Sequence, residues 1–329
     1  DVIATVEIAN NYGVPVLPRG GGTGLAGQTV GRAVVIDMSK YMNNLLELNS
    51  EERWVRVQPG MVLEQLNHLL RDQGLFFTPD PATSNRSNVG GAIGNNSCGA
   101  HSILYGKTVD HVKEVETVLS NGDVAMLGPL ADPALGAKLR LDGLEGEIYR
   151  QVIDIAKSNA SEVDHRYPKI MRRVSGYNLD EVINGSPINL AKLIVGSEGT
   201  LATVTEAKLN LVPRPRATAL MVVHFRGLIE ATEATVVTLE HRPAAVELMG
   251  RLLLNQIRVS VGYTRRRTFL EGDPDAVLLV EASGDTDTEV SAKLDEIEKG
   301  LRGHGMGYAF VKLMNRDEQA NVWEVRRDG

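Results

Sequence analysis

Apolar residues recur along the chain at helical and at strand spacing, and the two spacings predict alternating elements. Val2, Val6 and Ala9 precede Gly13 at helical spacing, which predicts an opening helix. A second helix is predicted at residues 62–70, where leucines recur every three or four positions before Gly74. Short apolar runs bounded by Gly, Pro or Asn predict strands at residues 14–17, 33–37, 54–58, 112–119, 194–195 and 200–211. We expect the last two to pair through a Gly-Ser-Glu-Gly turn, and the Asn-Gly-Asp at 121–123 to turn a hairpin.

The last third of the chain is more regular. Strands are predicted at residues 219–225, 244–248, 277–281 and 308–312, and helices at 228–240, 251–259 and around 290–301. Two βαβ-like units in succession favour a ferredoxin-like antiparallel sheet. Pro213 and Pro215 interrupt regular structure just before this part, since proline removes a donor and restricts its predecessor. The sequence therefore predicts an α+β protein with domains at 1–212 and 213–329.

Composition narrows the class of protein. The 329 residues hold 35 Lys and Arg against 42 Asp and Glu, a net charge of −7, which argues against nucleic-acid binding and against a surface that seeks anionic lipid. One cysteine excludes an internal disulfide framework and a cysteine-rich metal site. No apolar run approaches the ~18 residues of a membrane span, and nothing at the start resembles a signal peptide. We expect a soluble, cytoplasmic protein.

Both ends of the sequence look cut. The chain begins at Asp1 without a methionine, and it stops directly after a helix-like run that contains Trp323. We expect a portion of a longer protein, with catalytic groups beyond Gly329.

Glycine is enriched, at 33 of 329 residues or about one in ten against a usual ~7%. The first glycine-rich motif, residues 18–27, follows a predicted strand and suits a nest of backbone N–H groups around a diphosphate. A flexible linker is the alternative. The motif lacks the Gly-Lys-Ser/Thr of a Walker A loop. Its Gly22-x-Gly24-x-x-Gly27 spacing matches a Rossmann fingerprint, but a strand follows where that fold needs a helix.

Two further motifs suit a backbone that approaches a flat ligand closely. The second runs from Thr78-Pro79-Asp80-Pro81 through Asn88 to His101 and ends at Tyr105-Gly106. The third is the turn at residues 196–201.

In this order and spacing the three motifs resemble the FAD-binding domain of the vanillyl-alcohol oxidase/PCMH superfamily. The branch that is most similar contains glycolate oxidase flavoprotein subunits, D-lactate dehydrogenases and D-2-hydroxyglutarate dehydrogenases. Residues 173–180, Arg-Val-Ser-Gly-Tyr-Asn-Leu-Asp, resemble the large bacterial members that carry an iron–sulfur region. The resemblance implies two α+β subdomains that bind FAD, followed by an incomplete ferredoxin-like cap domain.

The resemblance also implies which residues bind the cofactor. The first motif would wrap the FAD pyrophosphate, and the other two would contact or lie near the flavin and ribityl groups. The residues implied are Pro18, Arg19, Gly20, Gly21, Gly22, Thr23, Gly24, Gly27, Pro79, Asp80, Thr83, Gly90, Gly91, Asn96, Gly99, His101, Tyr105, Glu198, Gly199 and Thr200. For His101, a backbone hydrogen bond at a glycine turn is the open alternative. Thr23-Gly24 stands where relatives often attach flavin through histidine, so noncovalent FAD is expected.

Substrate binding is implied at Arg326, within Trp323-x-x-Arg326, because an arginine fork suits a carboxylate. A simple ion pair is the alternative for Arg326. No catalytic base is assigned, since we expect it beyond Gly329. The scattered histidines show no metal-ligand spacing, so no metal site is expected within residues 1–329. The run Arg265-Arg266-Arg267 is expected to be a solvated loop or a contact to a segment outside this sequence.

The function implied is FAD-dependent oxidation of a small D-2-hydroxy acid to the 2-keto acid, by hydride transfer to flavin N5. Electrons would pass to an iron–sulfur region or a quinone pool. Two alternatives stay open: an FAD enzyme acting on another alcohol or a lactone, and a flavin-binding module without turnover.

Overall fold

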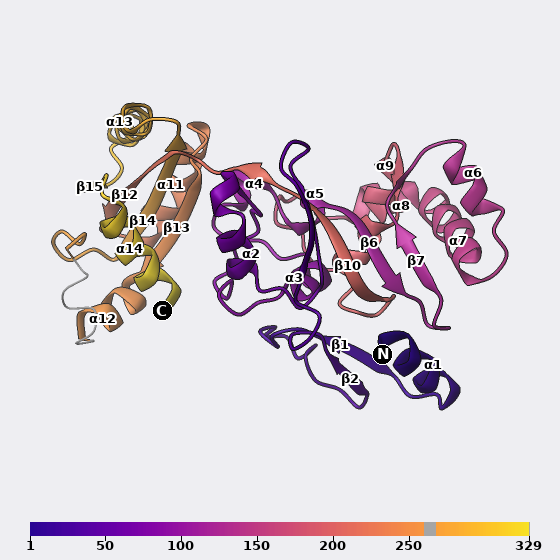
Figure 1. Ribbon diagram of the computed structural model, residues 1–329. Helices are drawn as coiled ribbons and strands as arrows, with labels where there is room; N and C mark the ends of the chain where they lie inside the picture. Colours follow the sequence, from indigo (N-terminus) through magenta and orange to yellow (C-terminus); the bar gives the residue numbers. More distant parts are fainter. Residues whose placement is uncertain (260–267, 329) are drawn as a thin grey trace. The chain divides into compact units, whose positions relative to one another are not determined.

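The computed structural model describes residues 1–259 and 268–328, and these form two compact units (Figure 1). The first unit is Asp1–Gly99 with Gly106–Pro213, and the second is Ala100–Tyr105 with Arg214–Gly329. The division after Pro213 falls one residue from the boundary predicted at 212. Residues 100–105 belong to the second unit, although the sequence predicts them within the first domain. The arginine run at 265–267 lies outside the described residues.

The first unit opens with a small parallel α/β element. Helix α1 (Val2–Asn11) buries Val6 and Ala9, which confirms the predicted opening helix. Strands β1 (Val16–Arg19) and β2 (Val34–Asp37) pair in parallel, with Val16 opposite Val34. The segment between these strands contains no helix, so the Rossmann reading of its glycines is excluded.

A five-stranded antiparallel sheet forms the centre of the first unit, in the order β3-β4-β10-β6-β7. Its strands are β3 (Leu45–Asn49), β4 (Trp54–Val57), β6 (Val112–Val118), β7 (Val124–Leu127) and β10 (Thr203–Asn210). Burial alternates along β10, and a register shift between Val204 and Glu206 interrupts its pairing with β6. The β6–β7 hairpin confirms the turn predicted at 121–123.

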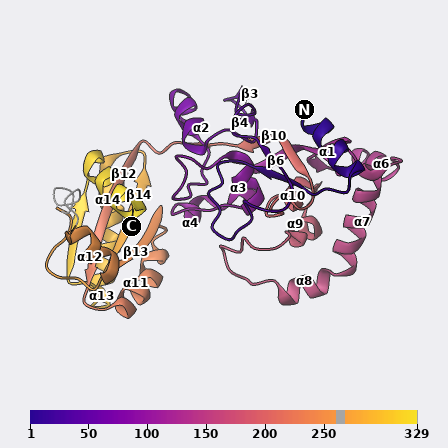
Figure 2. The ribbon, with the colours of Figure 1, turned by 90° about the horizontal axis from the view of Figure 1, so that it is seen from below.

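Helices and short strands complete this unit, and Figure 2 shows four of the helices gathered at one side of the five-stranded sheet. These four are α6 (Ala134–Leu139), α7 (Leu144–Ser158), α8 (Ala160–Arg166) and α9 (Leu179–Asn184). The others are α2 (Leu63–Leu69), η1 (Arg71–Gln73), α3 (Val89–Asn95), α5 (Thr108–His111) and α10 (Ala191–Ile194). The short strands are β5 (Leu75–Phe76), β8 (Pro129–Leu130), β9 (Ile188–Asn189) and β11 (Val212–Pro213).

One predicted strand is wrong. Residues 194–195 end helix α10 and pair with no strand, so the predicted hairpin with 200–211 does not form. The apolar run there is short, and periodicity alone does not separate a buried helical turn from a strand.

The second unit is a four-stranded antiparallel sheet in the order β13-β14-β12-β15, the ferredoxin-like arrangement that was predicted. Its strands are β12 (Ala217–Phe225), β13 (Ala245–Gly250), β14 (Ala276–Gly284) and β15 (Ala309–Leu313). Helices α11 (Leu228–Glu240) and α13 (Asp287–Gly303) bury apolar residues with one sheet face. Helices α12 (Arg251–Val259) and α14 (Arg316–Asp328) lie at the opposite face, and the short α4 (Ser102–Tyr105) contacts β13.

Across the described ranges, no helix is at once long enough and apolar enough to cross a lipid bilayer.

Candidate cofactor site

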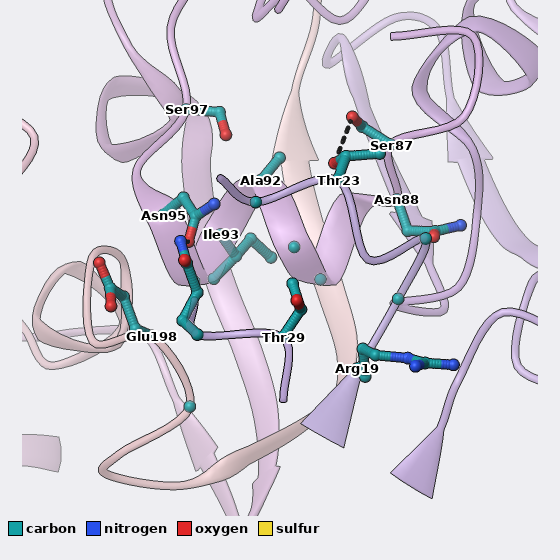
Figure 3. Close-up of a pocket in the computed structure, with 18 of the residues that line it drawn as sticks. Arg19, Thr23, Thr29, Ser87, Asn88, Ala92, Ile93, Asn95, Ser97 and Glu198 are labelled. Carbon is teal, nitrogen blue, oxygen red and sulfur yellow. Dashed lines mark hydrogen bonds between the residues drawn. The ribbon is translucent and has the colours of Figure 1, made fainter. Parts of the chain in front are cut away.

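A cavity of about 440 Å³ lies in the first unit, where the three glycine motifs meet (Figure 3). Twelve of its lining residues were predicted to bind a cofactor: Pro18, Arg19, Gly20, Gly21, Gly22, Thr23, Gly24, Thr83, Gly90, Gly91, Glu198 and Gly199. Segments far apart in sequence therefore converge on one concave site, as a binding pocket requires.

The first motif is packed too tightly for any residue but glycine at its centre. A Cβ on Gly21 would lie 2.2 Å from the carbonyl oxygen of Arg86. Beside it, the hydroxyl groups of Thr23 and Ser87 lie 3.1 Å apart (Figure 3). The Ser87 hydroxyl also lies 2.5 Å from that of Thr83. The loop after β1 is thus held against the loop that precedes α3, with backbone and hydroxyl groups at the cavity wall.

Helix α3 places glycines along the cavity wall. Gly90, Gly91 and Gly94 all line the cavity, although each glycine costs a helix interior up to about 1 kcal/mol relative to alanine. A Cβ on Gly91 would meet no protein atom within 4 Å. Because protein packing does not require glycine at 91, the space beside it is suited to a ligand.

Three polar atoms at the cavity have no hydrogen-bond partner in the part of the chain that the structure describes. They are Arg19 Nε, Gln28 Oε1 and Asn88 Oδ1, and all three are buried. Buried polar atoms are almost always paired in folded proteins, so these atoms fit a site that takes a polar ligand. A cofactor with phosphate, ribityl and amide groups supplies both donors and acceptors for them.

Arg19 is the cationic side chain of the first motif, and it pairs with Asp37. The Arg19 Nη2 to Asp37 Oδ2 distance is 3.3 Å. Hydrogen bonds from the hydroxyl and backbone N–H of Ser39 hold the pKa of Asp37 below its ordinary value. Asp37 therefore stays ionised beside the guanidinium group.

Glu198 has a strained backbone at the cavity edge. Its φ of 53° lies in the left-handed region, and its backbone N–H donates to the Gly94 carbonyl at 2.9 Å. Its side chain is exposed and lines the cavity. Non-glycine residues held in this conformation cluster at functional sites.

Eight predicted cofactor residues do not line this cavity. Gly27, Pro79, Asp80, Asn96, Gly99 and Thr200 lie in the first unit outside its wall, while His101 and Tyr105 belong to the second unit. Buried Asn96 instead accepts a hydrogen bond from the backbone of Val109. Flavin contacts by these eight residues stay a prediction.

His101 pairs with the sheet of the second unit. Its Nε2 lies 3.0 Å from Glu281 Oε1, and its ring centroid lies 5.8 Å from that of Trp323. Trp323 Nε1 donates to the other Glu281 oxygen at 3.0 Å. Burial beside β14 raises the pKa of Tyr105, whose hydroxyl bonds to Ser283.

Arg326 forms an ion pair, the alternative to substrate binding that the sequence also allows. Nε and Nη2 donate to Glu247 Oε2 at 2.9 and 2.7 Å, and Arg326 is about one-third exposed. The guanidinium has a third nitrogen, Nη1, for which no bond to a described residue is found.

Other cavity residues were not among the predicted cofactor residues, although more than half of them lie within the three motifs. These other residues are Leu25, Ala26, Gln28, Thr29, Met38, Pro59, Pro81, Ser87, Asn88, Ala92, Ile93, Gly94, Asn95, Ser97, Ile194, Ser197, Ala202 and Val204. Residues within or next to a glycine motif could have been predicted from that motif. Met38, Pro59 and Val204 lie outside the motifs, and only the fold brings them to the cavity. Among the described residues, no group of three or more His, Cys, Asp or Glu side chains is arranged to hold a metal ion.

Two family models match the chain. Residues 1–128 match the FAD binding domain, and residues 214–329 match the C-terminal domain of FAD linked oxidases. Alkyldihydroxyacetonephosphate synthase has a similar fold, with a TM-score of 0.64 at 20% identity, covering 99% of this chain and 56% of that one.

Dehydrogenases and an oxidase subunit are among the curated relatives. D-2-hydroxyglutarate dehydrogenase of Pseudomonas putida is 38% identical over 88% of this chain and 29% of its own length. The Escherichia coli protein of that name is 34% identical over 88% of this chain and 30% of its own length. Glycolate oxidase subunit GlcD of Bacillus subtilis is 28% identical over 99% of this chain and 58% of its own length. The chain thus spans about 30% of the first two relatives; its residues 1–128 belong to the FAD binding domain family, and residues 214–329 belong to the family of C-terminal domains of FAD linked oxidases.

Proposed function

We propose that this chain is the flavin-binding and substrate-binding part of an FAD-dependent dehydrogenase that oxidises a small D-2-hydroxy acid to the 2-keto acid. The observation that carries the proposal is the cavity formed by three glycine motifs, the first two of which lie within the residues that match an FAD binding domain. The relatives named above, which are dehydrogenases and an oxidase subunit of 2-hydroxy acids, support the substrate class.

The chain's own residues bind and orient the cofactor. The backbone of residues 20–24 suits the diphosphate, and the unpaired Arg19 Nε provides a cationic donor beside it. The space beside Gly91 suits a flat ring, and noncovalent attachment is part of the proposal. Bound FAD would supply the hydride acceptor for this oxidation, which is chemistry that no side chain supplies.

Arg326 is proposed to bind the substrate carboxylate. With Nε and Nη2 fixed by Glu247, the edge that carries Nη1 is left for a substrate. A charge-assisted hydrogen bond at that edge orients an anionic substrate. No described residue is assigned as the base for the hydroxyl proton, and we place that base beyond Gly329. An iron–sulfur region or a quinone as electron acceptor, and a cytoplasmic location, belong to the same proposal.

The function is tested with the full-length protein. D-lactate, glycolate and D-2-hydroxyglutarate are each added anaerobically, and bleaching of the flavin absorption is followed. We expect at least one to reduce the flavin, and Arg326→Ala to raise KM for that acid about tenfold or more, as loss of a charged hydrogen bond predicts. Arg327→Ala, the exposed neighbour on α14, is the matched control. Absence of flavin reduction by every 2-hydroxy acid would refute the function.

The pairing of Arg326 with Glu247 favours one alternative, an FAD enzyme whose substrate is an uncharged alcohol or a lactone. In that case Arg326 has only a structural role. An Arg326→Ala variant with unchanged KM for the accepted substrate would support this alternative. A protein that binds FAD but reduces it with no alcohol would support the module without turnover.

A further inference from the structure

Residues 167–178, here called the strap, join helices α8 and α9 without regular secondary structure. The strap is largely exposed, with Ile170 64% and Met171 50% accessible. An irregular exposed segment has few apolar contacts to fix it. Its side chains nevertheless bond to both of the later glycine motifs.

Arg172 connects the strap to the second motif. Its Nη2 donates to the Gly99 carbonyl at 2.6 Å, and Lys107 Nζ donates to the Met171 carbonyl at 3.0 Å. A Cβ on Gly99 would lie 2.1 Å from Asp80 Oδ1, so this backbone lies directly on Asp80. Arg172 thus holds one side of a peptide whose other side contacts Asp80.

Tyr177 connects the strap to the third motif. Its hydroxyl oxygen lies 2.9 Å from Thr200 Oγ1, and the Thr200 hydroxyl donates to the Ser197 carbonyl at 2.5 Å. Because the Thr200 hydroxyl group already donates its proton to the Ser197 carbonyl, the Tyr177 hydroxyl group donates the hydrogen bond to Thr200 Oγ1. Ser197 and Gly199 of the same turn line the cavity.

The third motif in turn packs on the first. A Cβ on Gly199 would lie 3.2 Å from Pro18 Cγ, so the turn at residues 196–200 lies against the strand end that opens the first motif. The hydrogen bond to Thr200 therefore helps to hold the third motif against the first motif at the cavity wall.

The strap also has contacts that hold its own shape. The Tyr167 hydroxyl donates to the Tyr177 carbonyl at 2.9 Å, and the Arg173 guanidinium lies 4.6 Å from the Tyr167 ring centroid. Arg173 also pairs with Asp180 at the start of α9, at 2.5 Å. These contacts present Tyr177 and Arg172 to their partners in one arrangement.

We propose that the strap is a brace for the FAD site, in which Tyr177 and Arg172 are positioning residues that hold the third and second glycine motifs around the cofactor. They act through Thr200 and Gly99. This role rests on FAD binding alone, and the identity of the substrate does not enter it.

The test is the rate at which the full-length holoprotein releases FAD. After dilution, free FAD is followed by its fluorescence, for the unmodified protein and for Tyr177→Phe, which removes only the hydroxyl group. We expect release to be three- to tenfold faster, the effect of about one hydrogen bond. Tyr12→Phe, at an 80% exposed tyrosine of the same unit, is the control and leaves the rate unchanged.

Two further variants keep the result specific. Arg172→Met is expected to accelerate release about two- to fivefold, since the hydrogen bond that it removes is exposed to water. Its control is Arg166→Met, in a surface pair with Glu162. In a double-mutant cycle, Tyr177→Phe in a Thr200→Val background is expected to add less than twofold, because the partner hydroxyl is already absent.

Release rates for Tyr177→Phe within twofold of the unmodified protein, or no release from either, would overturn the role of the strap. Full additivity with Thr200→Val would overturn it as well. Since no substrate is present, this result is independent of whether a 2-hydroxy acid reduces the flavin.

Discussion

Nε and Nη2 of Arg326 donate to the same oxygen of Glu247, at 2.9 and 2.7 Å, so one edge of the guanidinium group is fixed from strand β13. Glu247 is mostly buried, with 14% of its side chain exposed. A carboxylate in this position sets the plane and direction of the arginine. In the proposed function, this arrangement orients a residue near the end of α14 toward an anionic substrate.

Changing Glu247 to Gln is expected to raise KM for the 2-hydroxy acid about three- to tenfold, with kcat changed less than twofold. The amide presents a weaker acceptor, so Arg326 loses orientation while the flavin chemistry is untouched. Steady-state kinetics of the full-length enzyme measure both parameters. The control is Glu318→Gln, because Glu318 is exposed on α14, the helix that carries Arg326. An unchanged or lower KM would contradict the positioning of Arg326 by Glu247.

The variant Gly91→Ala tests whether the space beside residue 91 is needed for the ligand or for protein packing. Without FAD, the variant is expected to unfold at the same or a higher temperature, because alanine favours the helix by up to about 1 kcal/mol and its Cβ meets no protein atom. FAD is expected to bind at least tenfold more weakly, because the methyl group enters the cavity. Thermal unfolding and flavin titration give the two values. Unaltered FAD affinity would show that the cofactor does not occupy the space beside Gly91.

The control for that variant is Gly303→Ala at the end of α13. A Cβ there also meets nothing within 4 Å, and Gly303 belongs to the second unit. FAD affinity is expected to stay unchanged.

His224 makes stability depend on pH. Burial lowers the pKa of this fully buried side chain below its ordinary 6.5, and its Nε2 accepts a hydrogen bond from the Glu271 backbone N–H at 3.0 Å. Below pH 6.5 the unfolded chain takes up a proton that the folded chain does not. The free energy of unfolding therefore falls as pH decreases, by up to about 1.4 kcal/mol per pH unit. Above pH 6.5 this contribution is complete.

Urea unfolding of the unmodified protein and of His224→Gln, between pH 7.5 and 5, measures that contribution. The variant is expected to be less stable at neutral pH and to lose less stability on acidification. Comparing the two proteins cancels the other titrating groups. Parallel pH profiles would contradict a neutral buried His224.

Periodicity predicted most elements whose burial is one-sided. Helix α13 buries Val290, Leu294 and Leu301 in the predicted pattern, and all four strands of the second unit lie within a few residues of their predicted positions. Helices α6–α9 were not predicted, although Tyr149 and Ile153 of α7 join the core. Strand β3 was missed because Leu45-Leu46-Glu47-Leu48 does not alternate strictly between apolar and polar residues.

Glycine motifs predicted the cavity because close backbone approach needs particular residues at particular positions, as at Gly21. Contacts between residues far apart in sequence produce no comparable local pattern. His101 lies beside Glu281 because residues 100–105 belong to the second unit, and no local sequence pattern predicts this assignment. The pairing of Arg326 with Glu247 likewise joins residues 79 positions apart.

We propose that the cavity between the glycine motifs binds FAD without a covalent bond. The most direct test of this proposal is an absorption spectrum of the purified full-length protein, repeated on the supernatant after acid precipitation. A two-banded flavin spectrum that moves into the supernatant, with the mass of FAD, is the predicted result. Colour that stays with the pellet would contradict noncovalent binding at Thr23-Gly24. A colourless protein that takes up no added FAD would contradict the cofactor site itself.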